Sequence, residues 1–498
     1  MRWLLACSLL LAPRALVGQC PDGTPPPCGA RAATAPTSVA VLYFDNLSHD
    51  SSDAYLADGM TEELISRLSQ VERLQVKSRT AVQRLRGRPL GDPAGLGRSL
   101  AVAHLVSGSV LRSGQRLRVT VELMRAATGV SVWGRTFDRP AADLIGVEAE
   151  IAESVAVGVS GRLAPGERRR LEVRPTTNAA AYDHYLRGSF EIARRTTTSI
   201  LRAIREYEIA ARLDPRFVPP LVRAAGGYNM LSSIYAGPEV GMPRDTLRAR
   251  SRALVDRALR IDSTSSDAWL ARANSIVGDE RRVLDALAHA TAMDPRSAEA
   301  HHLYGIHLRD VGDDSAAAAE LRSALALEPD RAITLINLGE LFATGRQFAE
   351  ASRWTDSAAA LHPEAAFYYV EMGLTRLQLG DTAGARAAAA LTGSHGGANG
   401  QEELLAMLEA RAGDSAAARA RLVRVDSAMR GSDCYVSHPC VELAWALAAV
   451  GERERALAVL ERITPRNSWI AYWSRRAEWD PIRNDPRFQA VLREASRP

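Results

Sequence analysis

The sequence of 498 residues has very little lysine and little cysteine. Lys77 is the only lysine, so arginine carries nearly all of the positive charge. Within residues 45–162, acidic and basic residues nearly balance and interleave, without the basic stripe that binding to phosphate backbones requires. These features predict no nucleic-acid partner.

Long apolar runs are also absent. The run at residues 3–12 is far shorter than the roughly 18 residues that a membrane-spanning helix needs, and no later stretch approaches that length without charges. Arg2 precedes the run, and Pro13 and a short stretch ending at Gln19 follow it, which is the layout of a secretory signal peptide. We expect residues 1–19 to be removed on export to the periplasm, which leaves a soluble mature chain.

Four of the five cysteines form two close pairs, Cys20 with Cys28 and Cys434 with Cys440. In an exported protein such pairs are typical of local disulfides, whereas in the cytosol they would raise metal binding. Cys20 has an alternative use, because bacterial lipoproteins are cleaved and acylated at a cysteine in this position. Gln19 is larger than the small residue that usually precedes that cysteine. Only such a lipid would bring the chain to a membrane.

A linker rich in proline and alanine (residues 20–37) leads into residues 38–163, which have the pattern of a small α/β domain. SVAVLYFDNLS, beginning at Ser38, is an apolar run of strand length followed by turn residues. Apolar residues recur at helical spacing over residues 53–71 and again over residues 144–155. Between these two helices, alternating stretches at 105–111, 117–123 and 130–137 predict an antiparallel meander.

Two longer stretches of this domain carry a family resemblance. VAVLYFDNLSHDSSDAYLADGMTEELISRLSQ and SGSVLRSGQRLRVTVELMRAATGVSVWGRTFDR resemble the TolB-like amino-terminal domain, which is related to the flagellar-assembly FlgO type. The resemblance implies the fold of that family and an exported or envelope setting. Members often place tetratricopeptide repeats beside this domain, and larger regulators add a cyclase, a kinase or a winged-helix module. We find no such module in this sequence, so the resemblance implies no activity here.

Polar residues follow the first expected strand and begin the first expected helix: Asp45, Asn46, Asp58 and Glu62. Open α/β sheets often bind ligands at this place. Two interpretations are open: the side chains cap and solvate the turn, or they form a catalytic site. The turn has acidic and hydroxyl residues in place of the glycines of a phosphate-binding loop, so we favour capping. The sequence thus predicts no catalytic residue and no cofactor.

Internal periodicity is the most specific signal in the chain. Three sets of small residues or prolines recur at a step of 34 residues: Gly305, Gly339 and Gly373; Ala317, Ala351 and Ala385; Pro295, Pro329 and Pro363. A step of this length with these residue types is the tetratricopeptide pattern. Glycine and alanine let two helices of a repeat approach closely, and proline ends the second helix.

Weaker copies extend the array to both sides. We expect a linker at 164–180, about seven repeats at 181–470 with degenerate outer copies, and a capping segment at 471–498 that covers the last apolar face. The expected fold class is α+β overall, a small α/β domain followed by an all-α tetratricopeptide solenoid.

The first helix of each repeat lines a concave groove in this fold. By register, the inward positions are His302, Ile306, Ile336, Glu340, Val370 and Leu374. A groove of this mostly apolar character suits an amphipathic or extended apolar segment better than a carboxylate tail. The alternative is that these side chains pack only against neighbouring helices.

Other candidate sites are weaker. His301, His302 and His307 share one expected helix, but no two have the four-residue spacing that binds zinc from one helix face. No Gly-x-Ser-x-Gly elbow and no spaced set of Cys, His and Asp is present. The sequence therefore predicts neither a metal site nor an enzyme.

The leading hypothesis is a non-catalytic exported scaffold. Its repeats would bind a partner protein or peptide of the cell envelope, and its first domain would dock to a second envelope component. One alternative is an outer-membrane or periplasmic assembly lipoprotein anchored through Cys20. A further alternative is a regulatory or sensor subunit of an envelope signalling system.

Metabolic lipid labelling separates the two uses of Cys20. We expect neither the wild type nor Cys20→Ala to incorporate a labelled fatty acid, because a disulfide leaves no thiol to acylate. Cys20→Ala should instead expose the Cys28 thiol to alkylation without prior reduction. Label in the wild type that is lost in Cys20→Ala would establish acylation.

Overall fold

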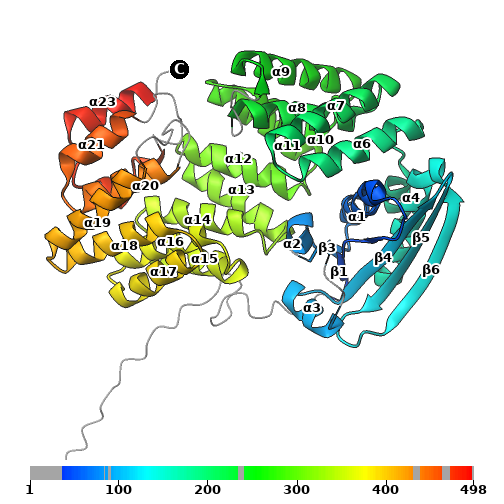
Figure 1. Ribbon diagram of the computed structural model, residues 1–498, viewed down its shortest axis with the longest axis horizontal. Coiled ribbons are helices and arrows are strands. Elements are labelled where there is room, and N and C mark those ends of the chain that lie inside the picture. The colour runs from blue at the N-terminus through cyan, green and yellow to red at the C-terminus, as the bar shows by residue number, and fades with distance from the viewer. Residues whose placement is uncertain are drawn as a thin grey trace, which may run out of the picture.

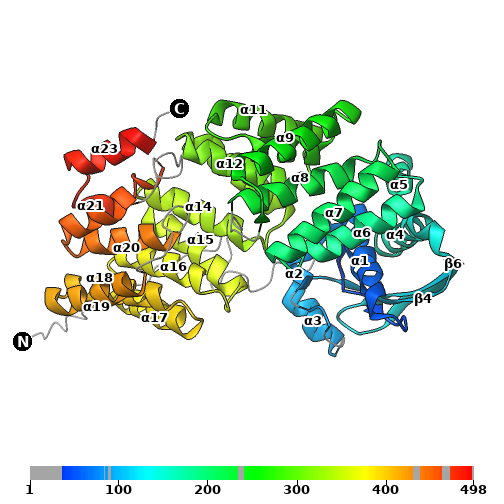
Figure 2. The same cartoon turned by 45° about the horizontal axis from the view of Figure 1, so that its top comes forward.

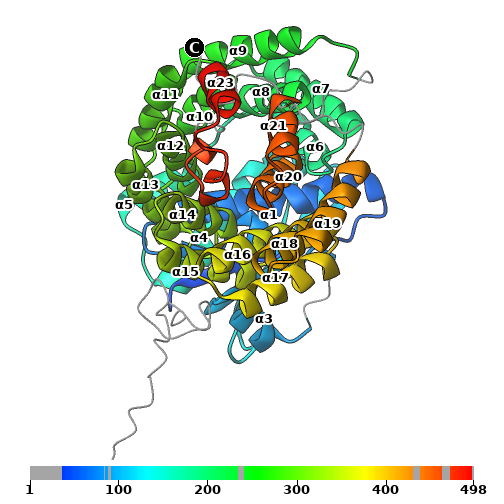
Figure 3. The same ribbon diagram turned by 90° about the vertical axis from the view of Figure 1, so that its left-hand side faces the viewer.

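The computed structural model describes residues 36–83, 85–87, 91–233, 240–429, 438–462 and 472–495. An α/β domain precedes a long series of helices, and the helices of the series follow one another along a curved path (Figures 1 and 3). Among the described residues, no helix combines the length and the apolar character needed to cross a membrane.

The sheet of the first domain mixes parallel and antiparallel strands. Its order is β3 (Gln75–Val76), β1 (Ser38–Val41), β4 (His104–Ser113), β5 (Arg116–Arg125) and β6 (Ser131–Pro140), and β2 (Asp45–Asn46) pairs with β4. β1 is parallel to β3 and β4, whereas β4, β5 and β6 form an antiparallel meander. β1 is buried throughout, and β5 alternates buried and exposed side chains, as expected for a central strand and for a strand with one solvated face.

Helices cover one side of this sheet. α1 (Ala54–Ser69) and α4 (Leu144–Ser160) contact each other and the sheet, and the short helices are η1 (Ser51–Asp53), α2 (Arg79–Gln83), α3 (Pro93–Leu100) and η2 (Ala141–Asp143). Asp92 caps α3 by accepting a hydrogen bond from the Ala94 amide at 3.0 Å, with Pro93 at the first helical position.

The stretch expected to be a linker, residues 164–180, contains a helix, α5 (Pro165–Glu172). Arg67 of α1 contacts the end of α5 and donates hydrogen bonds to the carbonyls of Leu171 at 2.8 Å and Val173 at 3.1 Å. The stretch is therefore packed against the first domain.

After α5, the described residues contain eight antiparallel helix pairs. They are α6 (Ala179–Ile192) with α7 (Thr197–Leu213), α8 (Val218–Ser233) with α9 (Arg244–Ile261), α10 (Ser266–Ser275) with α11 (Glu280–Met293), α12 (Ala298–Asp310) with α13 (Asp314–Leu327), α14 (Ala332–Thr344) with α15 (Phe348–Leu361), α16 (Ala366–Gln378) with α17 (Thr382–Ser394), α18 (Ala398–Arg411) with α19 (Ser415–Ala428), and α20 (His438–Ala449) with α21 (Arg453–Arg462). After them come η4 (Ala477–Trp479) and α23 (Pro486–Ala495). The chain thus contains a tetratricopeptide-type solenoid, as the 34-residue step predicts.

The periodic small residues lie where helices touch. A Cβ atom on Gly305 would lie 2.7 Å from Leu321 Cγ of α13, and one on Gly339 would lie 2.8 Å from Thr355 Cγ2 of α15. The alanines that share the step, Ala317, Ala351 and Ala385, have no exposed surface. Side chains at these glycines would force the two helices of a repeat apart, so the step in the sequence records a packing constraint.

The first domain and the first repeats share one hydrophobic core, which the views of Figures 1 and 2 place where α1 and α4 meet α6. Tyr182 of α6 donates a hydrogen bond to Glu148 Oε2 of α4 at 2.6 Å, and both side chains are buried. Tyr55 of α1 hydrogen-bonds to Asp183 of α6, and Arg187 lies over the Tyr55 ring at 4.2 Å. The domain is therefore fixed to the array by packing and by polar contacts.

The buried Glu148 makes stability depend on pH. Burial, together with the nearby Glu63, raises the pKa of Glu148 well above its ordinary value, so the folded protein favours the neutral acid. The stabilisation from this group is complete below the ordinary pKa of a glutamic acid and is lost as pH rises above it. We expect Glu148→Gln to unfold at higher urea than the wild type at pH 8 and at nearly the same urea at pH 4. Glu150→Gln, on a more exposed side of α4, is the control, and parallel curves for wild type and Glu148→Gln across this range would contradict the assignment.

Candidate partner-binding face

The first helices of three successive repeats carry charged side chains toward one another. Arg309 lies near the end of α12, Glu340 on α14 and Glu371 on α16, and all three are buried. Buried charges in a helical array need partners. We call the surface formed by the C-terminal parts of α12 and α14 and the middle of α16 the inner face.

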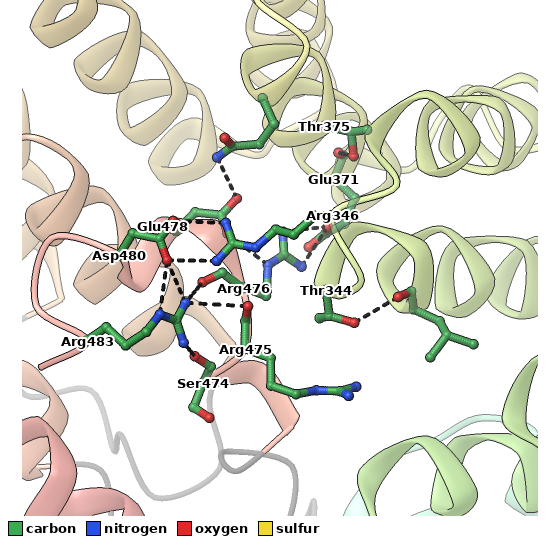
Figure 4. Close-up of polar contacts among 12 residues, drawn as sticks. Thr344, Arg346, Glu371, Thr375, Ser474, Arg475, Arg476, Glu478, Asp480 and Arg483 are labelled. Atoms are coloured by element: carbon green, nitrogen blue, oxygen red, sulfur yellow. Dashed lines mark hydrogen bonds and ion pairs between the residues drawn. The ribbon is translucent and has the colours of Figure 1, made fainter. Parts of the chain in front are cut away.

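The chain's own C-terminal segment lies against the inner face. We call residues 472–485 the strap; Tyr472 and Trp473 are helical, the short η4 follows, and the strap has no strand. Figure 4 shows Arg476 of the strap between Glu371 and Glu478. Its two Nη atoms donate to Glu371 Oε2 at 3.0 and 3.1 Å, and its Nε donates to Glu478 at 3.3 Å. The Arg476 and Glu371 side chains are only 2% and 1% exposed, so this pair is fully desolvated.

Arg309 forms the second buried contact of the inner face. It donates to Glu340 at 3.0 Å and to Asn337 Oδ1 at 2.6 Å, and its guanidinium carbon lies 4.1 Å from the centre of the Tyr472 ring. A guanidinium held by a carboxylate stacks well on an aromatic face because its own plane is weakly hydrated. Tyr472 therefore joins the strap to the same charge network.

Partly exposed ion pairs surround the buried ones. Arg475 of the strap makes a bidentate contact with Asp314 at 2.8 and 2.9 Å, and Asp480 makes one with Arg346 at 2.7 and 2.9 Å. The Arg475 and Asp314 side chains are 35% and 40% exposed. Exposed pairs of this kind are worth about 0 to 1 kcal/mol, so they guide the strap more than they stabilise it.

Aromatic rings hold the other side of the strap. Trp445 of α20 is completely buried, and its ring centre lies 5.1 Å from that of Trp473. The guanidinium carbon of Arg476 lies 4.4 Å from the centre of the Trp445 ring. Trp479 continues the cluster to Phe488 of α23, with 5.3 Å between their ring centres. This cluster covers the end of the array.

The six positions expected to line a groove have different surroundings in the structure. His302 is buried and its Nδ1 lies 2.9 Å from Thr334 Oγ1 of the neighbouring repeat; burial, with Arg331 and Arg309 nearby, lowers its pKa to about 3. Ile336, Val370 and Leu374 are buried in the hydrophobic clusters between helices, and Ile306 is half-buried. Of the six, Glu340 is the one whose contacts belong to the strap network.

The histidine group and the acidic turn make ordinary contacts. His301 pairs with Glu320 and His307 with Glu280, and the described residues contain no group of three side chains arranged to hold a metal ion. Asp58 pairs with Arg86, and the Asn46 side chain accepts a hydrogen bond from the Ser48 amide at 3.1 Å.

Glu62 borders a cavity of about 300 Å³ between α1, α6 and α8. It pairs with Arg79 at 2.8 Å, yet burial raises its pKa to about 6. Glu63, which also lines this cavity, has a raised pKa for the same reason. This cavity is the second candidate site, and the resemblance to a known domain did not indicate it.

Of the cysteines, Cys440 is buried and disulfide-bonded. Cys434, Cys20 and Cys28 lie outside the described residues, so their pairing stays a prediction.

The repeat register did not indicate the strap. The signal that could have found it is composition: YWSRRAEWD, residues 472–480, combines three aromatic rings with two adjacent arginines in a chain that is only 6% aromatic. These are the residue types that concentrate binding energy at protein interfaces.

Comparisons with known proteins show no family for this chain. No protein-family model matches the chain. Similar solved structures include PilF of Pseudomonas aeruginosa (21% identity, 43% of this chain and 95% of that one, TM-score 0.34), a tetratricopeptide repeat protein of Parabacteroides merdae ATCC 43184 (11%, 54% and 98%, 0.38) and YrrB, titled a TPR protein with an unusual peptide-binding site (18%, 37% and 90%, 0.27). These scores are too low to carry an argument, and the assignment of repeats rests on the helix pairs of this chain.

One curated relative corrects the expectation of a non-catalytic chain. A stretch of 178 residues, 36% of this chain, is 32% identical to the protein named "Putative adenylate cyclase 3" of Rhizobium meliloti (strain 1021), and it covers 30% of that protein. The prediction that the chain is not an enzyme is contradicted by this match. Repeat spacing indicates how the helices are arranged, but it does not exclude a catalytic activity. The prediction that the chain is not an enzyme therefore went beyond the evidence of the sequence. The chain spans less than a third of that relative's length, and the cyclase name describes that protein.

The buried and the exposed ion pairs of the strap should contribute differently to the unfolding free energy. Glu371→Ala leaves Arg476 without its main partner in a desolvated site, and we expect it to lower the unfolding free energy by about 3 to 5 kcal/mol. Arg475→Ala should cost less than about 1 kcal/mol. Urea denaturation followed by tryptophan fluorescence is the measurement, because Trp445, Trp473 and Trp479 surround the buried pair. Equal losses in the two variants would contradict this ranking.

Proposed function

We propose that this protein is an interaction scaffold whose repeat array binds an extended segment of a partner protein. The observation that supports the proposal is the strap. The inner face already holds a stretch of chain with little secondary structure, across three successive repeats, and the desolvated contact between Arg476 and Glu371 joins the two. A surface that binds one extended segment in this way is suited to binding another.

The proposal assigns the first domain a docking role, as a TolB-like domain. Its support is the resemblance carried by the two long stretches of residues 39–163. The continuous core with α6 and α7 adds to it, because a domain fixed to the array would hold the inner face at a set orientation to whatever the domain contacts.

The proposed setting is the periplasm. The layout of residues 1–19 supports export, and the disulfide at Cys440 fits an oxidising compartment.

Site-specific crosslinking in the native cell tests the scaffold. A photoreactive residue replaces either Gln378, whose side chain contacts Glu478 of the strap at 3.4 Å, or Arg386, which is exposed on α17 in the same repeat. We expect an adduct with a second protein from position 378 and none from position 386. No adduct at position 378 would mean that the inner face holds no partner, and the proposal would be wrong.

A further inference from the structure

The strap is a candidate template for what the inner face recognises. Its contacts come from tyrosine, tryptophan and arginine, the types enriched at interface hot spots, and the repeats supply the acidic side chains that receive the arginine. We propose that the inner face is a recognition site for segments that combine aromatic rings with adjacent arginines, and that a partner segment of this chemistry binds by exchanging with the strap. This inference rests on the proposed scaffold function and names its partner chemistry and its regulation.

The carboxylates of the inner face and the arginines of the strap have complementary charges. Glu371 takes both Nη atoms of one arginine, Asp314 takes a second arginine in a bidentate pair, and Glu340 holds Arg309 under the Tyr472 ring. Two carboxylates at fixed separation select adjacent arginines, because a guanidinium fork matches a carboxylate and an ammonium does not. A lysine-rich or acidic segment would lose these contacts.

The strap leaves some buried polar atoms near this site without hydrogen-bond partners. The indole nitrogen of Trp445, which lies next to the Arg476 guanidinium, is buried without a hydrogen-bond acceptor. Glu403 of α18, which lines a water-sized space with Trp445, Val370 and Leu374, is buried with its Oε1 unpartnered, and burial with Glu442 nearby raises its pKa well above the ordinary value. Each unsatisfied group costs free energy in the strap-bound state. A partner segment that supplies an acceptor to the Trp445 indole or a donor to Glu403 gains a contact that the strap lacks.

The strap is attached to the repeats partly through weak outer contacts. Its outer contacts, from Arg475 and Asp480, are partly exposed ion pairs and open easily. Because the strap is tethered, it competes with any added segment at a high effective concentration. Exchange should therefore be weak in the wild type and should increase when the outer contacts of the strap alone are removed.

The test uses a fluorescent peptide with the sequence of residues 472–485 and the full mature chain. The variant Arg475→Ala/Asp480→Ala weakens the strap and leaves the inner face intact, so the added peptide keeps every contact that the strap has lost. We expect fluorescence anisotropy to give about three- to tenfold tighter binding to this variant than to the wild type, because each lost ion pair is worth about 0 to 1 kcal/mol. A peptide with alanine at the position of Arg476 should bind at least tenfold more weakly, and this comparison leaves the protein unchanged. Hydrogen exchange of residues 472–485 should speed up when the peptide binds.

Three outcomes would overturn the inference: equal peptide binding by variant and wild type, equal binding of the alanine peptide, or binding that leaves hydrogen exchange of the strap unchanged. The peptide is defined, so these results are independent of any cellular partner. A crosslinked partner at position 378 together with a failed peptide exchange would leave the scaffold standing and reject only the exchange with the strap.

Discussion

The close approach of helices at the periodic glycines is the constraint on which the rest of the structure depends. At Gly305 and Gly339 a single added carbon would meet the facing helix at under 3 Å, so each repeat is held to nearly the same separation. Repetition of one geometry gives the array a regular curvature. That curvature brings Arg309, Glu340 and Glu371, each 31 residues from the next, to one surface.

The strap uses this surface through contacts that are better suited to specificity than to stability. Desolvating an arginine and a carboxylate costs nearly what their attraction returns, so a buried pair such as Arg476 with Glu371 adds little net stability but penalises any misplacement. The apolar stabilisation comes instead from the rings around Trp445. The end of the array is thus held in place by packing and set in register by charge.

A second group of acids, all with raised pKa values, lies at the other end of the molecule. Glu62, Glu63 and Glu148 lie where the first domain meets the first repeats, and burial raises the pKa of each. Clusters of this kind occur at functional sites and also at purely structural contacts. Here their shared consequence is that rising pH weakens the contact between the domain and the array.

The sequence by itself determined the local and periodic features. The 34-residue step followed from side chains that must fit between two adjacent helices, and the meander followed from the alternation of residues 105–137, because both patterns depend on neighbours in the chain. Tertiary structure decided the site. Arg476 and Glu371 are 105 residues apart, and only the accumulated rotation of the repeats brings them within 3.0 Å. Tertiary structure also shows that Ile336, Val370 and Leu374 are buried, which fits the alternative that the sequence left open, because the next repeat packs on them.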